Sequence, residues 1–393
     1  MKKIFTFSLL ILFIMGASGQ KPSLTKAYNL YYDKDFVKAK EAIDLCTQDE
    51  KLSPKAQTWL YKGNIYFYLA NQEYGEKQKN SNYIIQFPDA PIEAYNAFAK
   101  AEEINKAVEA YEMFGPSEGR SKLYALLLIR GVDQIIANDL ANAKNTLEKS
   151  VTSYEMVPPS VSLKGEPYYY YAYTLDLLNQ KEEARINYDK ALKDGSVNSN
   201  VYARLIDLYK KENNKAKVLE LINLGKRNIP EDPSILLAEV DYYYWIENFE
   251  KGHQLITKLP ASVYSNPDAI VNVANFYIND NNYFTADSLL KKAYQLNPHN
   301  FVVVYNLGYC NLKLYEIKFL ESNDLAIKGY KDKSTIANTL ADNYLTEAEK
   351  YFEFALDIEP KDLKILEQLK EIYARKQSPK YDAIIQRINS INK

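Results

Sequence analysis

Two short stretches decide the fold of this chain: WLYKGNIY, residues 59–66, and AYNAFAKA, residues 94–101. Each indicates one helix of a pair, because a small residue such as Gly63 lets two helices approach closely while large aromatic residues fill the space beside it. The arrangement recurs with a period of about 34 residues from Ala56 onward. One helix pair cannot bury its apolar face alone, so stacked neighbours must share a continuous core.

Further copies of this pattern follow along the chain. The stretch YYYYAYTLDLLNQKEEARINYDKAL, residues 168–192, places Tyr168, Ala172 and Ala191 at the corresponding positions. Other copies span residues 202–230, 267–298 and 307–360, and weaker ones lie around residues 27–43, 131–147, 240–256 and 366–373. The sequence therefore predicts about nine helix pairs.

The pattern resembles the tetratricopeptide repeat (TPR) family, as an exported bacterial member of it. That family carries Trp, Leu, Gly and Tyr on the first helix, Ala, Phe and Ala on the second, and Pro at the exit. The corresponding residues here are Trp59, Gly63, Tyr66, Ala94, Phe98 and Ala101, while Lys62 stands where Leu is expected. The resemblance implies an all-α fold, an α-α superhelical solenoid of about nine tetratricopeptide-type helix pairs.

Two copies are interrupted in the turn between their paired helices. From Tyr66 to Ala94 is 28 positions and from Asn311 to Ala348 is 37, where the family spacing is about nine. We therefore expect insertions near residues 75–93 and near 315–342. Insertions of this length are often functional or poorly ordered.

A third irregularity, VPPSVSLKGEP, spans residues 157–167 and indicates a break between two sub-solenoids. The expected organisation is N-terminal repeats in residues 20–160 and C-terminal repeats in residues 164–393.

The start of the chain has the order of a secretory signal peptide. Lys2 and Lys3 precede an apolar run from Ile4 to Gly16, and small residues follow up to Gly19. Cleavage near Gly19 would export the protein to a periplasmic or extracellular space and leave Gln20 first, without the cysteine of a lipid anchor. No other apolar run reaches the roughly 20 residues of a membrane span, so none is expected in the mature chain.

Composition excludes several classes of partner. The chain is 47% hydrophobic and 25% charged, with a net charge of −2 that becomes −4 without the two lysines of the leader. No basic run supplies the field that nucleic acid requires. Cys46 and Cys310 lie near opposite ends of the repeats, so we expect both to stay unpaired. The two cysteines and two histidines lack metal-ligand spacing, and neither a metal nor a cofactor is predicted.

Catalysis is not expected either. GPSEG, residues 115–119, matches the nucleophile elbow of hydrolases, but that motif needs a preceding strand, and a helical segment precedes it here. The interpretation that we favour is a turn between repeats. His253 and His299 are the available bases, one within a repeat's second helix and one just after an exit proline. The chain is therefore predicted not to be an enzyme.

The resemblance implies that set positions of each first helix line the concave face of the solenoid. At these positions the chain carries Asn64, Tyr169, Tyr173, Asp176, Arg204, Asp207, Asp241, Tyr244, Asn272, Asn275, Tyr305, Asn306 and Tyr309. Tyrosine combines a rigid apolar body with a hydrogen-bonding tip and suits either a peptide or a sugar. Among these, Tyr173 and Tyr244 are expected in the open groove. Tyr277, which is outside this set, is expected in the core.

The favoured function is a non-enzymatic protein-protein interaction scaffold of the cell envelope that binds a peptide or protein partner on this face. The alternative is a carbohydrate-binding module that uses a Tyr-rich groove. The family's clamp for a peptide carboxylate is incomplete, because Val271 and Gln368 stand where two of its three cations are expected. The oligomeric state, the organism and the identity of the partner stay open.

Overall fold

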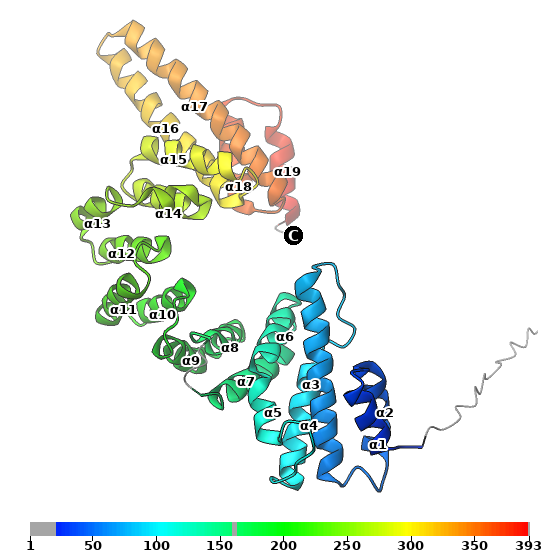
Figure 1. Cartoon of the computed structure of the whole chain (residues 1–393). Helices are drawn as coiled ribbons and strands as arrows, with labels where there is room; N and C mark the ends of the chain where they lie inside the picture. Colours follow the sequence, from blue (N-terminus) through cyan, green and yellow to red (C-terminus); the bar gives the residue numbers. More distant parts are fainter. Residues whose placement is uncertain (1–20, 159–162, 392–393) are drawn as a thin grey trace, which may run out of the picture. The chain divides into compact units, whose positions relative to one another are not determined.

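The computed structural model describes residues 21–158 and 163–391. The leader predicted for residues 1–19, and Gln20, lie outside this range. Every regular element in the described residues is a helix, and the α-helices form nine successive pairs with one additional short helix, α5 (Figure 1). The prediction of an all-α solenoid of about nine helix pairs is therefore confirmed. None of the described helices is both long and apolar enough to cross a membrane.

The chain divides after Val197 into two compact units. The predicted break at residues 157–167 lies within the first unit, and residues 159–162 are outside the described range. The helices of the first unit are α1 Leu24–Tyr32, α2 Phe36–Gln48, α3 Ala56–Lys79, α4 Ala90–Ile104, α5 Pro116–Lys122, α6 Tyr124–Ile136, α7 Leu140–Glu155, α8 Glu166–Leu177 and α9 Lys181–Lys193.

The second unit begins at Asn198 and has its own apolar core. Its helices are α10 Ser199–Lys211, α11 Lys215–Asn228, α12 Pro233–Trp245, α13 Phe249–Ile256, α14 Pro267–Asn279, α15 Tyr283–Leu296, α16 Phe301–Ile327, α17 Lys331–Ile358, α18 Leu363–Arg375 and α19 Tyr381–Ile391, with a short 3₁₀ turn, η1, at Ala261–Ser265.

One turn recurs between the paired helices. A residue with positive φ stands between the end of the first helix and the N-cap of the second, as at Asn213 (φ 54°) and Asn281 (φ 59°). Asparagine tolerates this left-handed conformation better than most residues. The N-caps that follow, Asn214 and Asn282, accept hydrogen bonds from the backbone N–H of Lys217 and Thr285. This turn returns the chain so that the second helix packs back on the first.

The predicted close approach of glycines to aromatic residues is present. A Cβ on Gly63 of α3 would lie 2.7 Å from the Phe98 ring of α4, and a Cβ on Gly308 of α16 would lie 2.9 Å from the Phe352 ring of α17. Both rings are fully buried. Only glycine permits these two helix pairs to pack at this distance.

Both predicted insertions lengthen helices of their pairs, and the first also contains a loop at residues 80–89. The first lengthens α3 to Lys79, and the buried Glu73 orders the loop that follows by accepting hydrogen bonds from Tyr83 Oη (2.6 Å) and the backbone N–H of Gln86 and Phe87. The second lengthens α16 and α17 to 27 and 28 residues, about twice the 13 and 14 residues of α14 and α15. We call α16 and α17 together the long hairpin.

Both cysteines are buried and free, as predicted. Burial raises the pKa of the Cys310 thiol to about 12 and also raises the pKa of the Cys46 thiol. At neutral pH both side chains are therefore protonated and behave as small apolar core residues.

Candidate binding groove

A groove of about 660 Å³ crosses three successive first helices of the second unit, α10, α12 and α14. Four of the residues predicted for the concave face line it: Asp207, Asp241, Asn272 and Asn275. They come from three different repeats, and the solenoid brings them to one surface. This is the part of the predicted site that the structure assembles.

Helical spacing explains why these side chains share one surface. Asp268, Asn272, Asn275 and Asn279 of α14 follow each other at intervals of four, three and four residues and all line the groove. Residues at this spacing lie on one face of an α-helix. Sequence reasoning named only the middle two, although the same periodicity identifies Asp268 and Asn279.

The floor of the groove is apolar and its rim is polar. Ile206, Leu237 and Phe276 form part of the lining and are buried, whereas Asn272 and Asn279 are exposed. Such a surface offers apolar area to the side chains of a ligand and amide groups to its backbone.

All three charged residues that line the groove are aspartates. Asp207 has a side chain that is 64% exposed, with Lys211 at 3.5 Å, whereas Asp241 forms a 2.5 Å ion pair with Lys210 across the interface of α10 and α12. Asp268 accepts a 3.1 Å hydrogen bond from Asn300 Nδ2. Asp207 on α10 and Asp268 on α14 thus place exposed carboxylates on the two outer helices of the groove.

The amide of Asn275 is already oriented by a neighbour. Asn306 Nδ2 on α16 donates a 2.9 Å hydrogen bond to Asn275 Oδ1. That bond uses the Asn275 amide oxygen, and Asn275 itself lines the groove. Asn306 thus contributes to the site through Asn275, because it is not itself among the lining residues.

Asn64 was predicted on the open face, and this prediction is wrong. Its side chain is fully buried beneath residues 105–115, which we call the covering segment. Asn64 Oδ1 accepts from Phe114 N at 2.9 Å, and Asn64 Nδ2 donates to Phe114 O at 3.0 Å. The chain thus occupies this position with its own irregular backbone. The covering segment has no helical period and was not recognisable from the repeat pattern.

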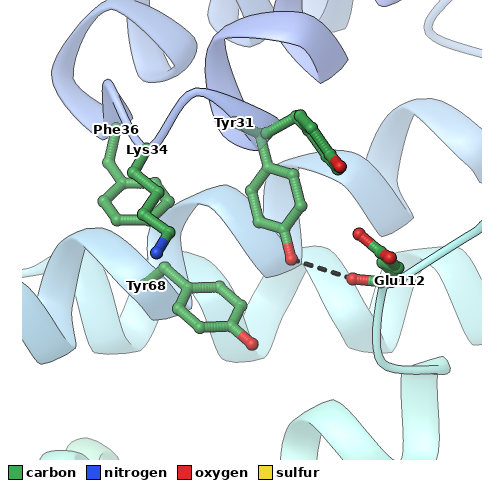
Figure 2. Close-up of a pocket in the computed structure, with 6 residues that line it drawn as sticks. Tyr31, Lys34, Phe36, Tyr68 and Glu112 are labelled. Atoms are coloured by element: carbon green, nitrogen blue, oxygen red, sulfur yellow. Dashed lines mark hydrogen bonds between the residues drawn. The ribbon is translucent and has the colours of Figure 1, made fainter.

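A second hollow, of about 520 Å³, lies beside the covering segment (Figure 2). The rings of Tyr31, Phe36 and Tyr68 surround it, with the Phe36 and Tyr68 rings stacked at 5.6 Å. Tyr31 Oη donates a 3.0 Å hydrogen bond to the backbone oxygen of Glu112, drawn as the dashed line in Figure 2. This bond holds the covering segment against α1.

Two predicted tyrosines of the first unit form an aromatic cluster instead of an open stripe. Tyr169 is only 8% exposed and lies 6.2 Å from the Tyr188 ring, while Tyr173 stacks on Tyr169 at the same centroid distance. Asp176 is half-buried on the same helix, α8. Arg204 is half-buried on α10 and does not line the groove of the second unit.

Tyr244 is a packing residue, which corrects the prediction that it stands in the open groove. Its ring lies against Gly252, where a Cβ would be 2.5 Å away, and stacks on Phe276 at 4.8 Å. Its hydroxyl donates a 2.7 Å hydrogen bond to Asp280, and burial raises its pKa above the ordinary value. Tyr277, which was expected in the core, is half-buried and packs against the apolar core of the second unit.

Tyr305 and Tyr309 of α16 are half-buried and pack against the core of the second unit. The Tyr305 ring contacts Phe352 edge-on at 5.8 Å, and Lys313 lies over the Tyr309 ring at 5.7 Å. Most of the predicted tyrosines therefore stabilise helix packing, and the groove is lined by aspartate and asparagine.

The described residues offer little for catalysis. GPSEG begins α5, with Gly115 as its N-cap, and no strand precedes it in the described part of the chain. His253 lies 3.1 Å from Asp280, which also accepts from Tyr244, and this polar contact joins α12, α13 and α14. Within residues 21–158 and 163–391, no group of three or more His, Cys, Asp or Glu is placed to hold a metal ion.

No family model matches the chain, and no curated protein matches its sequence. Several solved structures are similar to it. Human IFIT1, in a dimer with PPP-AAAA, is 18% identical with a TM-score of 0.43, over 83% of this chain and 67% of that one. Yeast Tom70 is 14% identical with a TM-score of 0.48, over 93% and 90% of the two chains. A tetratricopeptide repeat protein from Parabacteroides merdae is 13% identical with a TM-score of 0.47, over 78% and 98%.

The helix pairs, the recurring turn and the glycine-aromatic contacts define the class of this protein. It is a helical solenoid of the tetratricopeptide type. What distinguishes this solenoid is the groove of aspartates and asparagines on α10, α12 and α14.

Proposed function

We propose that this protein is a non-enzymatic scaffold that binds an extended, lysine- or arginine-bearing segment of a partner protein in the groove of α10, α12 and α14. The observation that supports this proposal is the placing of Asp207, Asp241 and Asp268 from three successive repeats on one open surface. Carboxylates favour cationic ligands, and their spread over three helices suits a ligand that runs across the repeats.

A peptide fits the remaining groups of the groove. The Asn272, Asn275 and Asn279 amides can donate to and accept from a peptide backbone, and the apolar floor can take its alternate side chains. A carbohydrate remains the second candidate because the same amides suit sugar hydroxyls. The lining offers a sugar only one aromatic ring, Phe276, and that ring is 8% exposed.

The binding proposal is tested with fluorescent extended peptides of matched length that carry either lysine and arginine or aspartate and glutamate. We expect the basic peptides to bind and their affinity to fall with added salt, because exposed charges are screened. Replacing Asp207 and Asp268 together by asparagine should weaken binding roughly tenfold or more. Asp241 is left intact because its 2.5 Å ion pair with Lys210 joins α12 to α10, whereas the 3.5 Å pair of Asp207 with Lys211 lies within α10.

The control is Asp382→Asn, which removes an exposed carboxylate from α19 of the same unit and should leave the affinity unchanged. Equal binding of acidic and basic peptides would contradict the proposed electrostatic selection. Binding on a glycan array, with no peptide bound, would favour the carbohydrate alternative.

We also propose that the protein works in the cell envelope after export, on the strength of the charged, apolar and small-residue order of residues 1–19. Mass spectrometry of the protein recovered from its native host should find an N-terminus at Gln20. An intact Met1 in the mature protein would refute this location.

A further inference from the structure

The long hairpin carries an unusual concentration of exposed apolar side chains. Of the 23 exposed large hydrophobic residues in the described chain, seven lie between Ile317 and Leu340. Figure 1 shows the far half of α16 and α17 extending beyond the neighbouring helices of the second unit. Apolar surface gathered in this way marks an interaction site more often than scattered single residues do.

Three of the exposed apolar residues of α16 form one stripe. Ile317, Leu320 and Ile327 are 46%, 67% and 86% exposed. The face that packs on α17 is marked by buried Ser322, whose Oγ donates a 2.9 Å hydrogen bond to Ser334 O. At 100° per residue, the apolar stripe lies on the opposite face of α16 from this contact. The apolar stripe is therefore free to meet another molecule.

Charge narrows the choice of that molecule. The hairpin from Lys313 to Asp342 carries Lys313, Lys318, Lys328, Lys331 and Lys333 against Glu316, Glu321, Asp324, Asp332 and Asp342. The opposite charges are equal in number, so the surface has no net field for an anionic membrane or a strongly charged partner. A partner with a similarly balanced pattern is favoured.

The stripe is complementary to itself. Lys313, Ile317, Leu320 and Asp324 follow at intervals of four, three and four residues, a palindromic spacing. When two such helices pack antiparallel about a twofold axis, Ile317 meets Leu320 of the second copy, and Lys313 meets Asp324 of the second copy. A twofold interface requires this kind of self-complementary patch.

Neighbouring contacts support the same register. Lys313 lies 2.8 Å from Glu316, and Asp324 lies 2.7 Å from Lys328, so each cross-copy pair would join an existing ion pair. The same register places Lys328 of the second copy opposite the Tyr309 ring, a favourable arrangement for a cation.

We propose that two copies of this chain associate through antiparallel packing of their α16 helices, with Ile317 and Leu320 at the centre and Lys313 opposite Asp324 at each end. This association does not depend on what the groove of α10, α12 and α14 binds. The long hairpins of the two chains then form the dimer interface.

Sedimentation velocity of the purified whole chain tests the proposal over roughly a hundredfold range of concentration. We expect a dimer that dissociates on dilution. Ile317→Glu with Leu320→Glu should give a monomer with an unchanged helical circular dichroism spectrum and melting temperature. The matched control, Ile136→Glu, changes an isoleucine of α6 that is 79% exposed and lies outside the long hairpin, and it should leave the dimer intact.

Charge reversal at Lys313 and Asp324 tests the antiparallel register of the two α16 helices. Lys313→Glu or Asp324→Lys alone should weaken dimerisation roughly tenfold or more, because like charges then oppose each other. The double variant should recover most of the affinity, since the charges are exchanged. A wild-type monomer throughout the range, dimerisation unaffected by the stripe variants, or monomers that bind neutral lipid vesicles through Leu320 would each overturn the proposal.

Discussion

Phe98→Ala is expected to lower the free energy of unfolding of the first unit by about 3–5 kcal/mol. The Phe98 ring is fully buried, and it fills the space beside two glycines, Gly63 of α3 and Gly119 of α5. Removing the ring leaves a cavity between three helices, which glycines cannot fill. Thermal and urea denaturation followed by circular dichroism will measure the loss.

Phe284→Ala is the matched control, because the Phe284 side chain is 70% exposed. The free energy of unfolding of Phe284→Ala should stay within about 0.5 kcal/mol of the wild-type value. If Phe98→Ala had the same melting temperature and urea midpoint as the wild type, Phe98 could not be the residue that joins α3, α4 and α5.

The second large effect is expected at Tyr244. Tyr244→Ala should destabilise the second unit by roughly 2–4 kcal/mol, because the half-buried ring packs on Gly252 and Phe276. Tyr244→Phe keeps the ring and loses the hydrogen bond to Asp280, so the loss should be about 1–2 kcal/mol. Thermal denaturation of both variants measures the difference.

Tyr111→Ala serves as the control for Tyr244, since the Tyr111 side chain is 73% exposed and should tolerate truncation. A Tyr244→Ala variant as stable as the wild type would restore Tyr244 to the open groove, where repeat register alone had placed it. The contribution of the hydroxyl can be separated from that of the ring. The difference between the wild type and Tyr244→Phe reports on the hydrogen bond to Asp280 alone.

Sequence periodicity predicted the fold because the packing contacts recur. Gly63 with Phe98 and Gly308 with Phe352 occupy the same places in two distant repeats, so one register explains both. The same register named Asp207, Asp241, Asn272 and Asn275, and these four residues line one groove on α10, α12 and α14. Local rules were sufficient here because each contact involves residues of one pair or of adjacent pairs.

The errors have physical causes that the repeat pattern does not contain. Asn64 occupies a concave position, yet the covering segment, which is irregular, buries it through two hydrogen bonds to Phe114. Tyr244 lies against Gly252 of its partner helix α13 and stacks on Phe276 of the next repeat. In both cases a contact that the repeat register does not specify decides where the side chain goes.

The covering segment also bears on the valency of the proposed peptide binding. Asn64 and Asn275 stand at the same register position, but Asn64 already binds the backbone of Phe114, while Asn275 faces an open groove. The first unit has therefore filled this position with its own backbone, which competes with a free peptide at the effective concentration of an intramolecular contact. A calorimetric titration should saturate at one peptide per chain. Two chains joined through α16 would then present two equivalent grooves, and a target with repeated basic segments would gain avidity from both.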